Sequence, residues 1–311
     1  MRRCSASLRQ VSVIPIPMNL GQPFLGLDKG PSAIIDGGLM SLLGGLGWRI
    51  DHAPPLVVET GREILYDLPA GLKAKHCYQV GEGCKIIQTH VKKYYHNGSF
   101  PLILGGDHCI ATGTIPAIKA VNENAAIVWV DAHADINTPQ RSISGNMHGM
   151  PVAFLMGLVD GADTLPGFDW LQPCLKPHDV FYIGLRDVDD DEKDTIRSLG
   201  IRAYSMHDVD RLGIGNVMEQ VLDQIGDRPI HLSFDIDAID PFYAPHTGTA
   251  VTGGLTFREG NFICESLYSS GKLSSMELVE VDPSQHPEVE YSKTVDMALT
   301  LIGSAMGKRI L

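Results

Sequence analysis

Three short apolar runs in this chain are each followed by acidic or histidine residues, and this arrangement restricts the fold more than any other feature of the sequence. The runs, at residues 102–104, 125–130 and 230–234, have the length and composition of buried strands. The polar residues that follow them are His108, Asp131, His133, Asp135, Asp235 and Asp237. Because side chains two residues apart on a strand point to the same face, we expect these groups to converge on one cavity.

Four carboxylates and two imidazoles form a hard, oxygen-rich ligand set that can hold two divalent cations. This set favours manganese over zinc or copper, because carboxylate and water oxygens suit manganese and no thiolate is needed. A single Asp or His after a strand is more often a turn former or a helix cap, and Asp107 and Asp240 fit that description. For the six together, no Lys or Arg lies within the ligand runs, so a metal is the better counter-charge.

Three segments resemble the signature motifs of the ureohydrolases, the family of arginases and agmatinases. They are GGDH at 105–108, DAHAD at 131–135 and SFDIDAIDP at 233–241. The similarity runs from about Val13 to about Gly307 and is closest to the arginases. Residues 136–139 and 144–149 resemble the arginase substrate loop, which agmatinases are not expected to match. The other matching segments are 184–189, 247–249, 253–260 and 280–283.

The resemblance implies the arginase fold, a three-layer α/β/α domain with a mainly parallel, eight-stranded sheet and two Mn²⁺ per subunit at one sheet edge. The implied ligands of one manganese are His108, Asp131, Asp135 and Asp235, and those of the other are Asp131, His133, Asp235 and Asp237. Asp131 and Asp235 would therefore bridge the two ions. The implied reaction is hydrolysis of L-arginine to L-ornithine and urea through a metal-bridging hydroxide, within arginine metabolism and the urea cycle.

The same resemblance gives catalytic roles to Asp135, His148 and Glu280. Asp135 would accept a hydrogen bond from the hydroxide and pass a proton to the leaving amine. His148 is expected to be a proton shuttle, although a His in a Gly-flanked loop is, on sequence alone, more often simply exposed. Glu280 would face the substrate guanidinium. The alternative, a surface ion-pair residue, is weaker because Val279 and Val281 alternate with it.

Recognition of the amino-acid end of arginine needs donors for a carboxylate and an acceptor for an ammonium group. At positions that match the arginase pattern, the donors are Asn137, Ser144 and Asn146, the acceptor is Asp189, and the supporting residues are Asp187 and Thr249. A site for agmatine would not require the carboxylate donors. This loop therefore favours arginine as the substrate.

Strand-like and helix-like stretches alternate along the chain, which predicts parallel strands joined by crossover helices. Further strands are expected at 11–16, 202–204 and 276–281, and helices at 31–43, 83–95, 191–199, 216–225, 259–268 and 293–306. The ligands are spread from His108 to Asp237, so the segments between them must fold together. We expect a single domain over residues 1–311, with 1–10 as a flexible N-terminus.

The composition of the chain bears on its possible binding partners and on its cellular compartment. The net charge of −12 argues weakly against nucleic-acid binding, and no run approaches the ~20 apolar residues of a membrane span. Six scattered cysteines without CxxC spacing predict reduced thiols. We expect a cytoplasmic protein. The mitochondrion is the alternative, because residues 1–9 are basic and contain no acids.

Two departures from the family pattern concern assembly. Ile35 stands where an arginine is expected in the GPxxIR stretch, and the chain stops soon after Gly307 without the tail that many arginases use in trimer contacts. We therefore expect a homotrimer weaker than usual, with a site complete within each subunit. Two other functions remain open: an agmatinase-type or guanidinobutyrase-type ureohydrolase, and a non-catalytic metal-binding homologue. The latter usually lacks ligands, whereas all six are present here.

Overall fold

The structure is a computed structural model that describes residues 9–58, 68–95, 98–285 and 292–309. At its centre lies one sheet of eight parallel strands in the order β2-β1-β3-β8-β7-β4-β5-β6. The strands are β1 (Gln10–Ile16), β2 (Arg49–His52), β3 (Ser99–Gly105), β4 (Ala126–Val130), β5 (Val180–Leu185), β6 (Arg202–Ser205), β7 (Ile230–Asp235) and β8 (Leu273–Val279).

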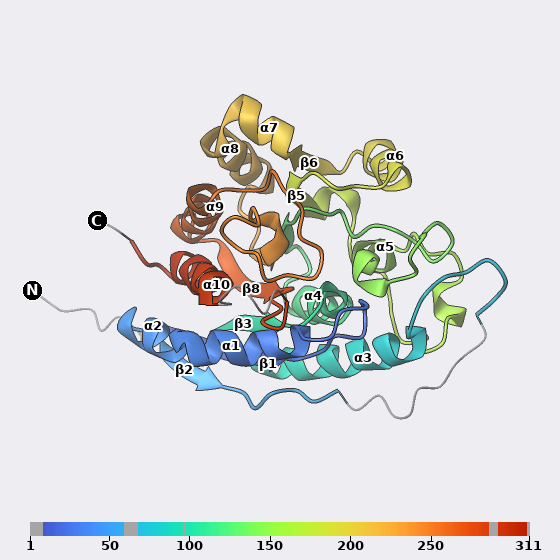
Figure 1. Ribbon diagram of the computed structural model, residues 1–311, viewed down its shortest axis with the longest axis horizontal. Coiled ribbons are helices and arrows are strands. Elements are labelled where there is room, and N and C mark those ends of the chain that lie inside the picture. The colour runs from blue at the N-terminus through green and yellow to red at the C-terminus, as the bar shows by residue number, and fades with distance from the viewer. Residues whose placement is uncertain (1–8, 59–67, 96–97, 286–291, 310–311) are drawn as a thin grey trace, which may run out of the picture.

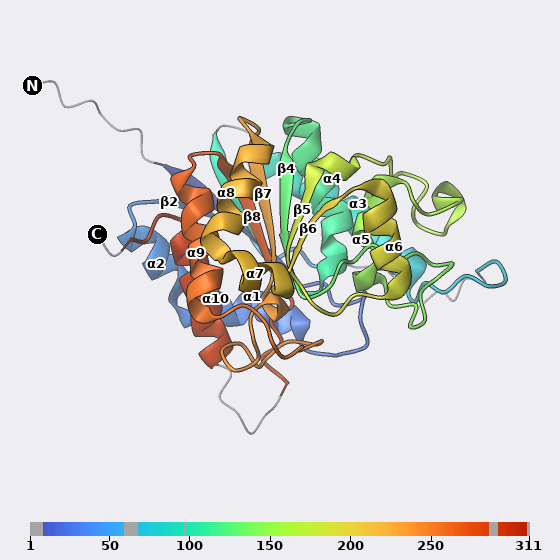
Figure 2. The same ribbon diagram turned by 90° about the horizontal axis from the view of Figure 1, so that it is seen from above.

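Helices cover both faces of this sheet, as Figures 1 and 2 show. One face carries α1 (Gly30–Ile34), α2 (Met40–Gly45), α7 (Met206–Leu212), α8 (Ile214–Ile225), α9 (Phe257–Ser269) and α10 (Ser292–Ala305). The other carries α3 (Cys77–Tyr94), α4 (Ala111–Val121), α5 (Pro151–Met156) and α6 (Asp190–Leu199). The predicted three-layer α/β/α architecture is confirmed. Among the described helices, none combines the length and apolar character needed to cross a bilayer.

Strands β3 and β4 are apolar almost throughout because each is covered on both faces, and β7 alternates apolar residues with the buried polar residues His231 and Ser233. All residues of β3, β4 and β7 are buried. Alternate side chains of β4 enter opposite cores: Val128 packs on the α8 and α9 side, and Ile127 and Trp129 pack on the α3 and α4 side. This two-sided burial explains why these strands appear in the sequence as continuous apolar runs.

Several predicted boundaries differ from the structure. The helix expected at 31–43 is interrupted by a π-helical turn (Ile35–Leu39), in which Gly38 has φ 111°. α3 begins at Cys77 rather than at residue 83, and the last strand ends at Val279, before Glu280. Most of the segment predicted to be flexible, residues 1–8, lies outside the described residues, and Gln10 already belongs to β1. The prediction also omitted β2, β5, α4, α5 and α7.

The strand order brings the ligand-bearing segments together. β3, β8, β7 and β4 are neighbours in the middle of the sheet, although β4 follows β3 in the chain and β7 and β8 come more than a hundred residues later. All four are parallel, so their carboxyl ends open at one edge. Ligand sites of α/β proteins lie at such an edge, where the winding of the chain changes direction.

Gly106, between β3 and the first ligand loop, offers a test of how tightly this edge is packed. A Cβ atom there would lie 1.8 Å from the carbonyl oxygen of Met18, which also accepts a hydrogen bond from the Asp107 amide at 2.8 Å. Because backbone must move, we expect Gly106→Ala to lower the free energy of unfolding by roughly 3 kcal/mol. Urea denaturation would measure this change.

Gly44 in α2 provides the matched control, since a Cβ atom there would meet nothing within 4 Å. Gly44→Ala should leave the stability unchanged or raise it by up to about 1 kcal/mol. Equal unfolding midpoints for the two variants would show that the edge can relax around residue 106.

Candidate metal centre

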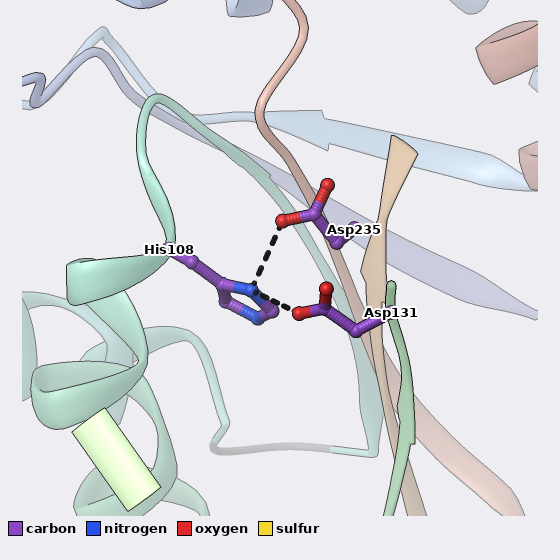
Figure 3. A group of neighbouring side chains, drawn as sticks. All are labelled: His108, Asp131 and Asp235. Carbon is purple, nitrogen blue, oxygen red and sulfur yellow. Dashed lines mark ion pairs between the residues drawn. The ribbon is translucent and has the colours of Figure 1, made fainter. Parts of the chain in front are cut away.

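His108 lies among three carboxylates that come from other loops. Its Nδ1 atom is 3.1 Å from Asp131 Oδ2 and 3.2 Å from both Asp135 Oδ2 and Asp235 Oδ2. Figure 3 shows His108 with Asp131 and Asp235 converging on this nitrogen. All four side chains are buried. The segments after β3, β4 and β7 thus meet at one point.

A second group of ligand-type atoms adjoins the first. His133 Nδ1 lies 3.0 Å from Asp237 Oδ2 and 3.4 Å from Asp131 Oδ1. Asp131 therefore faces one imidazole with each of its oxygens. Within His108, Asp131 and Asp235, and likewise within Asp131, His133 and Asp237, the ligand-type atoms lie within 4.8 Å of one another. The geometry provides two adjacent cation sites that share Asp131.

The buried carboxylates need positive charge close by. Burial and the charges of Asp237 and Asp131 raise the pKa of Asp235 well above its usual value. Burial alone would lower the pKa of His108, but its hydrogen bonds to the carboxylates raise it well above the ordinary range. Either protons or metal ions must therefore neutralise the cluster, and ligands of this kind suit divalent cations.

Hydrogen bonds behind His108 fix which of its nitrogens faces the carboxylates. His108 Nε2 lies 2.8 Å from Ser233 Oγ, and Ser233 donates its only hydroxyl proton to Glu277 Oε1 at 2.7 Å. An ionised carboxylate can only accept, so Ser233 must accept from Nε2–H. In the neutral imidazole, Nδ1 then carries the lone pair and faces three carboxylates, and no described group donates to it. That arrangement fits a cation between them.

Turns bring the six predicted side chains together, so the strand alternation expected from the sequence was wrong as the reason for their convergence. β4 ends at Val130, and the DAHAD segment forms a loop in which Asp135 has φ 51°. Asp131 Oδ1 accepts the amide of His133 at 2.7 Å, and Asp235 Oδ1 accepts the amide of Asp237 at 2.8 Å. Such bonds to the residue two positions on are typical of Asp-initiated turns.

Two carboxylates near the cluster, those of Asp107 and Asp240, accept hydrogen bonds from backbone amides. Asp107 accepts the amides of Cys109 at 2.9 Å and Gly21 at 2.7 Å. Asp240 accepts three amides of nearby loop residues, those of Phe242, Gly253 and Gly254. Both act as turn or cap residues, in agreement with the sequence-based interpretation.

A cavity of about 240 Å³ adjoins the carboxylate cluster. All six residues predicted to bind or support the substrate line it, together with the ligand-type side chains of His133 and Asp135 and the predicted shuttle His148. The complete lining is His133, Asp135, Asn137, Ser142, Ser144, Asn146, His148, Gly149, Asp187, Asp189, Glu192 and Thr249. Glu280 is not part of this wall. It is fully buried, with Oε1 3.5 Å from His148 Nδ1.

The wall of the cavity is organised by hydrogen bonds among its polar groups. Asn137 Nδ2 donates to Asp189 Oδ2 at 2.9 Å, and the Asn146 carbonyl oxygen accepts from Lys75 Nζ at 2.9 Å. The second bond leaves the Asn146 amide group available as a donor. The Ser144 hydroxyl accepts the Asn146 backbone amide at 3.2 Å, so its proton is also available.

The two predicted supporting residues contact ligand-type side chains. Thr249 Oγ1 donates to Asp237 Oδ2 at 3.0 Å. Asp187 Oδ2 lies 3.7 Å from His133 Nε2, on the side of the imidazole away from the carboxylates. Both contacts orient residues of the second cation site, as outer-shell partners of metal ligands commonly do.

Comparison with known proteins identifies the family. The family model described as "Arginase family" matches residues 9–307. The arginase of Glaciozyma antarctica is 41% identical over 98% of this chain and 90% of its own length. The chain belongs to the arginase family. The solved arginase of Bacillus caldovelox superimposes with a TM-score of 0.89 at 38% identity, covering 97% of this chain and 100% of that one. The Entamoeba histolytica arginase, solved with L-ornithine, gives 0.84 at 30% identity, covering 98% and 100%.

Glu192 is a further candidate site residue, which was not predicted from the sequence. Glu192 lines the cavity beside Asp189 and accepts the amides of Asp189 at 3.0 Å and Ile136 at 3.1 Å. Burial raises its pKa to about 7. The available signal was the capping-box spacing of Asp189 and Glu192 at the start of α6.

Trp129, Ser233 and Glu277 were also missed. Trp129 donates to Asp131 Oδ2 at 2.9 Å and stacks on His108 with ring centroids 4.1 Å apart. Ser233 and Glu277 are polar residues that alternate with apolar ones in β7 and β8, and that was their only local signal. Their partners became visible only with the pairing of β7 and β8.

A substitution at Glu277 tests whether this arginase-family centre depends on the orientation of His108. We expect Glu277→Gln to weaken manganese affinity at the site nearest His108 roughly 10- to 100-fold. The Gln amide group can donate to Ser233 Oγ. His108 Nε2–H is then no longer required as the donor to Ser233, so the orientation of the imidazole proton is no longer fixed. Equilibrium dialysis with manganese would measure the two affinities separately.

Thr114→Val is the matched control, since Thr114 donates to the other oxygen of Glu277 at 2.6 Å but does not contact Ser233 in the described hydrogen bonds. Its metal affinities should stay within about threefold of wild type. Equal weakening of both sites by Glu277→Gln would contradict the proposed chain from Glu277 to His108.

Proposed function

We propose that this protein is a dimanganese hydrolase that cleaves L-arginine to L-ornithine and urea. The observation that carries the proposal is the paired ligand cluster that shares Asp131 and adjoins a cavity with groups suited to an amino acid. Membership of the arginase family and the likeness to solved arginases support the same reaction. The oxygen-rich donor set supports manganese as the metal.

The reaction needs activation of a weak nucleophile. The guanidinium carbon is a poor electrophile because its charge is spread over three nitrogens. Divalent cations held by His108, Asp131, His133, Asp135, Asp235 and Asp237 would supply hydroxide near neutral pH by lowering the pKa of water. The protein side chains then have to orient the guanidinium and move a proton to the leaving amine.

His148 and Asp135 are the groups placed for proton movement. Both lie on the cavity wall, and His148 Nδ1 is 3.5 Å from Glu280 Oε1. Burial alone would lower the pKa of His148, but its hydrogen bond to Glu280 raises it to about 9. His148 can therefore hold a proton at neutral pH and deliver it to the amine, with Asp135 as the second carrier.

The opposite part of the cavity wall suits the amino-acid end of the substrate. Asn137, Ser144 and Asn146 would donate to the α-carboxylate, and Asp189 and Glu192 would accept from the α-ammonium group. The Entamoeba histolytica relative, solved with L-ornithine, is consistent with such a ligand. We assign these five residues to substrate recognition.

Urea release tests the proposal directly. The metal-free protein should release no urea from L-arginine, and loading with manganese should produce steady turnover and about two bound ions per chain. Zinc-loaded protein serves as the comparison for metal identity. Absence of urea from the manganese-loaded protein would refute the reaction.

We further propose a homotrimer, with each catalytic site built from one chain, and a cytoplasmic location with the mitochondrion as the alternative. The support is the family resemblance for the trimer, and for the self-contained site the fact that every residue named above belongs to one chain. Light scattering across a dilution series, paired with specific activity, would test both parts. A stable monomer would refute the trimer.

A further inference from the structure

The loop between β1 and α1 hydrogen-bonds to the two segments that carry His108 and His148. The Gly21 amide donates to Asp107 Oδ2 at 2.7 Å, and the Gly21 carbonyl accepts from the His148 amide at 3.1 Å. A Cβ atom on Gly21 would lie 2.6 Å from Asp107 Oδ1, so the backbone approaches too closely for a larger residue. The next residue, Gln22, is consequently held in a fixed position and is buried, with 6% of its surface exposed.

Gln22 contacts the carboxylate of Glu280. Gln22 Nε2 donates to Glu280 Oε2, while Glu280 Oε1 accepts the His108 backbone amide at 2.8 Å. Because an ionised carboxylate can only accept hydrogen bonds, Gln22 must present its NH₂ group to it. Gln22 Oε1 then points away and has no hydrogen-bond partner among the described residues.

The surroundings prevent Gln22 from turning aside. A Cβ atom on Gly248 would lie 2.4 Å from Gln22 Oε1 and 2.8 Å from Nε2, so the amide packs directly on the backbone of that loop. Glu280 itself is fully buried and has φ 66°, a conformation that costs a non-glycine residue free energy. The unpaired oxygen of Gln22 and the strained backbone of Glu280 both cost free energy. Their presence on the two sides of this hydrogen bond indicates that the contact has a role beyond packing.

We propose that Gln22 is a positioning residue for guanidinium recognition: its NH₂ group fixes the carboxylate of Glu280 in the orientation that receives the substrate guanidinium. This inference rests on the proposed function and on the role that the family resemblance implies for Glu280, contact with the substrate guanidinium. The bond from Gln22 occupies one oxygen and the His108 amide occupies the other, so the carboxylate plane cannot rotate. Through Oε1, 3.5 Å from Nδ1 of the cavity residue His148, this carboxylate adjoins the cavity wall.

Gln22→Glu isolates this role because it has the same size but replaces the donor with an acceptor. In the manganese-loaded protein we expect kcat/KM for L-arginine to fall at least ~10-fold. The Kd for L-ornithine, measured by calorimetry, should change less than about twofold, since ornithine has no guanidinium. Gln22→Leu, which removes the donor without adding charge, should give the same pattern.

Gln79→Leu is the matched control. Gln79 lies in α3, is 4% exposed, and is absent from the cavity wall. It should leave kcat/KM for arginine and the ornithine Kd within about twofold of wild type, whatever its effect on the melting temperature.

The outcomes separate the inference from the proposed function. A wild-type protein that releases no urea would refute the proposed function. A functional wild type whose Gln22→Glu and Gln22→Leu variants keep kcat/KM for arginine would refute the positioning role. Parallel weakening of arginine turnover and ornithine binding would also overturn it, because a general disturbance of the cavity would then explain the loss.

Discussion

Agmatine should be hydrolysed at least ~100-fold more slowly than L-arginine by the manganese-loaded protein. Agmatine lacks the α-carboxylate, so the donors of Ser144 and Asn146 and the second amide proton of Asn137, whose Nδ2 also donates to Asp189, would remain without an acceptor. Ser144 is exposed and Asn137 and Asn146 are partly exposed, so a bound substrate would have to cover them. A polar group that is covered without a partner costs about 1 to 3 kcal/mol, and sites built to bind a polar group reject analogues that lack it. Initial rates of urea release from both compounds, compared as kcat/KM, measure this preference.

Ser144→Ala provides the control for the source of this preference. The variant should slow arginine hydrolysis by roughly 10-fold while leaving agmatine hydrolysis nearly unchanged, since only arginine uses the hydroxyl. Comparable urea production from arginine and agmatine by the wild type would contradict the assignment of arginine as the substrate.

Removal of a shared carboxylate should have the largest effect on catalysis. Asp131 faces both His108 and His133, and Asp235 is predicted to bridge as well, so Asp131→Ala or Asp235→Ala should disturb both cations. We expect kcat to fall by about 10³-fold or more, since the metals contribute several kcal/mol to transition-state stabilisation. His108→Ala, which removes a ligand of one ion only, should be less severe.

Metal analysis of the same variants checks the reason for the loss. If the Asp235→Ala variant retained two tightly bound manganese ions per chain, the bridging role predicted for Asp235 would be wrong. Asp240→Ala is the matched control, because Asp240 also follows β7 but accepts the amides of Gly253 and Gly254 rather than facing an imidazole. Its metal content should equal that of wild type.

The ligand set and the fold class could be predicted from the sequence because both depend on local patterns. Strands covered on both faces must be apolar, so a strand end followed by Asp or His stands out, as at Asp131 and Asp235. The substrate loop could be recognised because its family motif is continuous in the chain. Helix and strand boundaries were less accurate, since α3 begins and β8 ends beside residues that hydrogen-bond to distant loops: the Lys75 amide to Gly145 and the Glu280 amide to Gly106.

By itself the sequence determined which side chains are available at the strand ends, because residue type and apolar periodicity are local properties. Tertiary structure decided how those side chains meet. The insertion of β8 and β7 between β3 and β4 places Glu277 beside Ser233, and the loop after β1 carries Gln22 to Glu280, 258 residues away. Such contacts depend on strand order and loop conformation, which arise from packing of the whole chain and leave no periodic signal in the sequence.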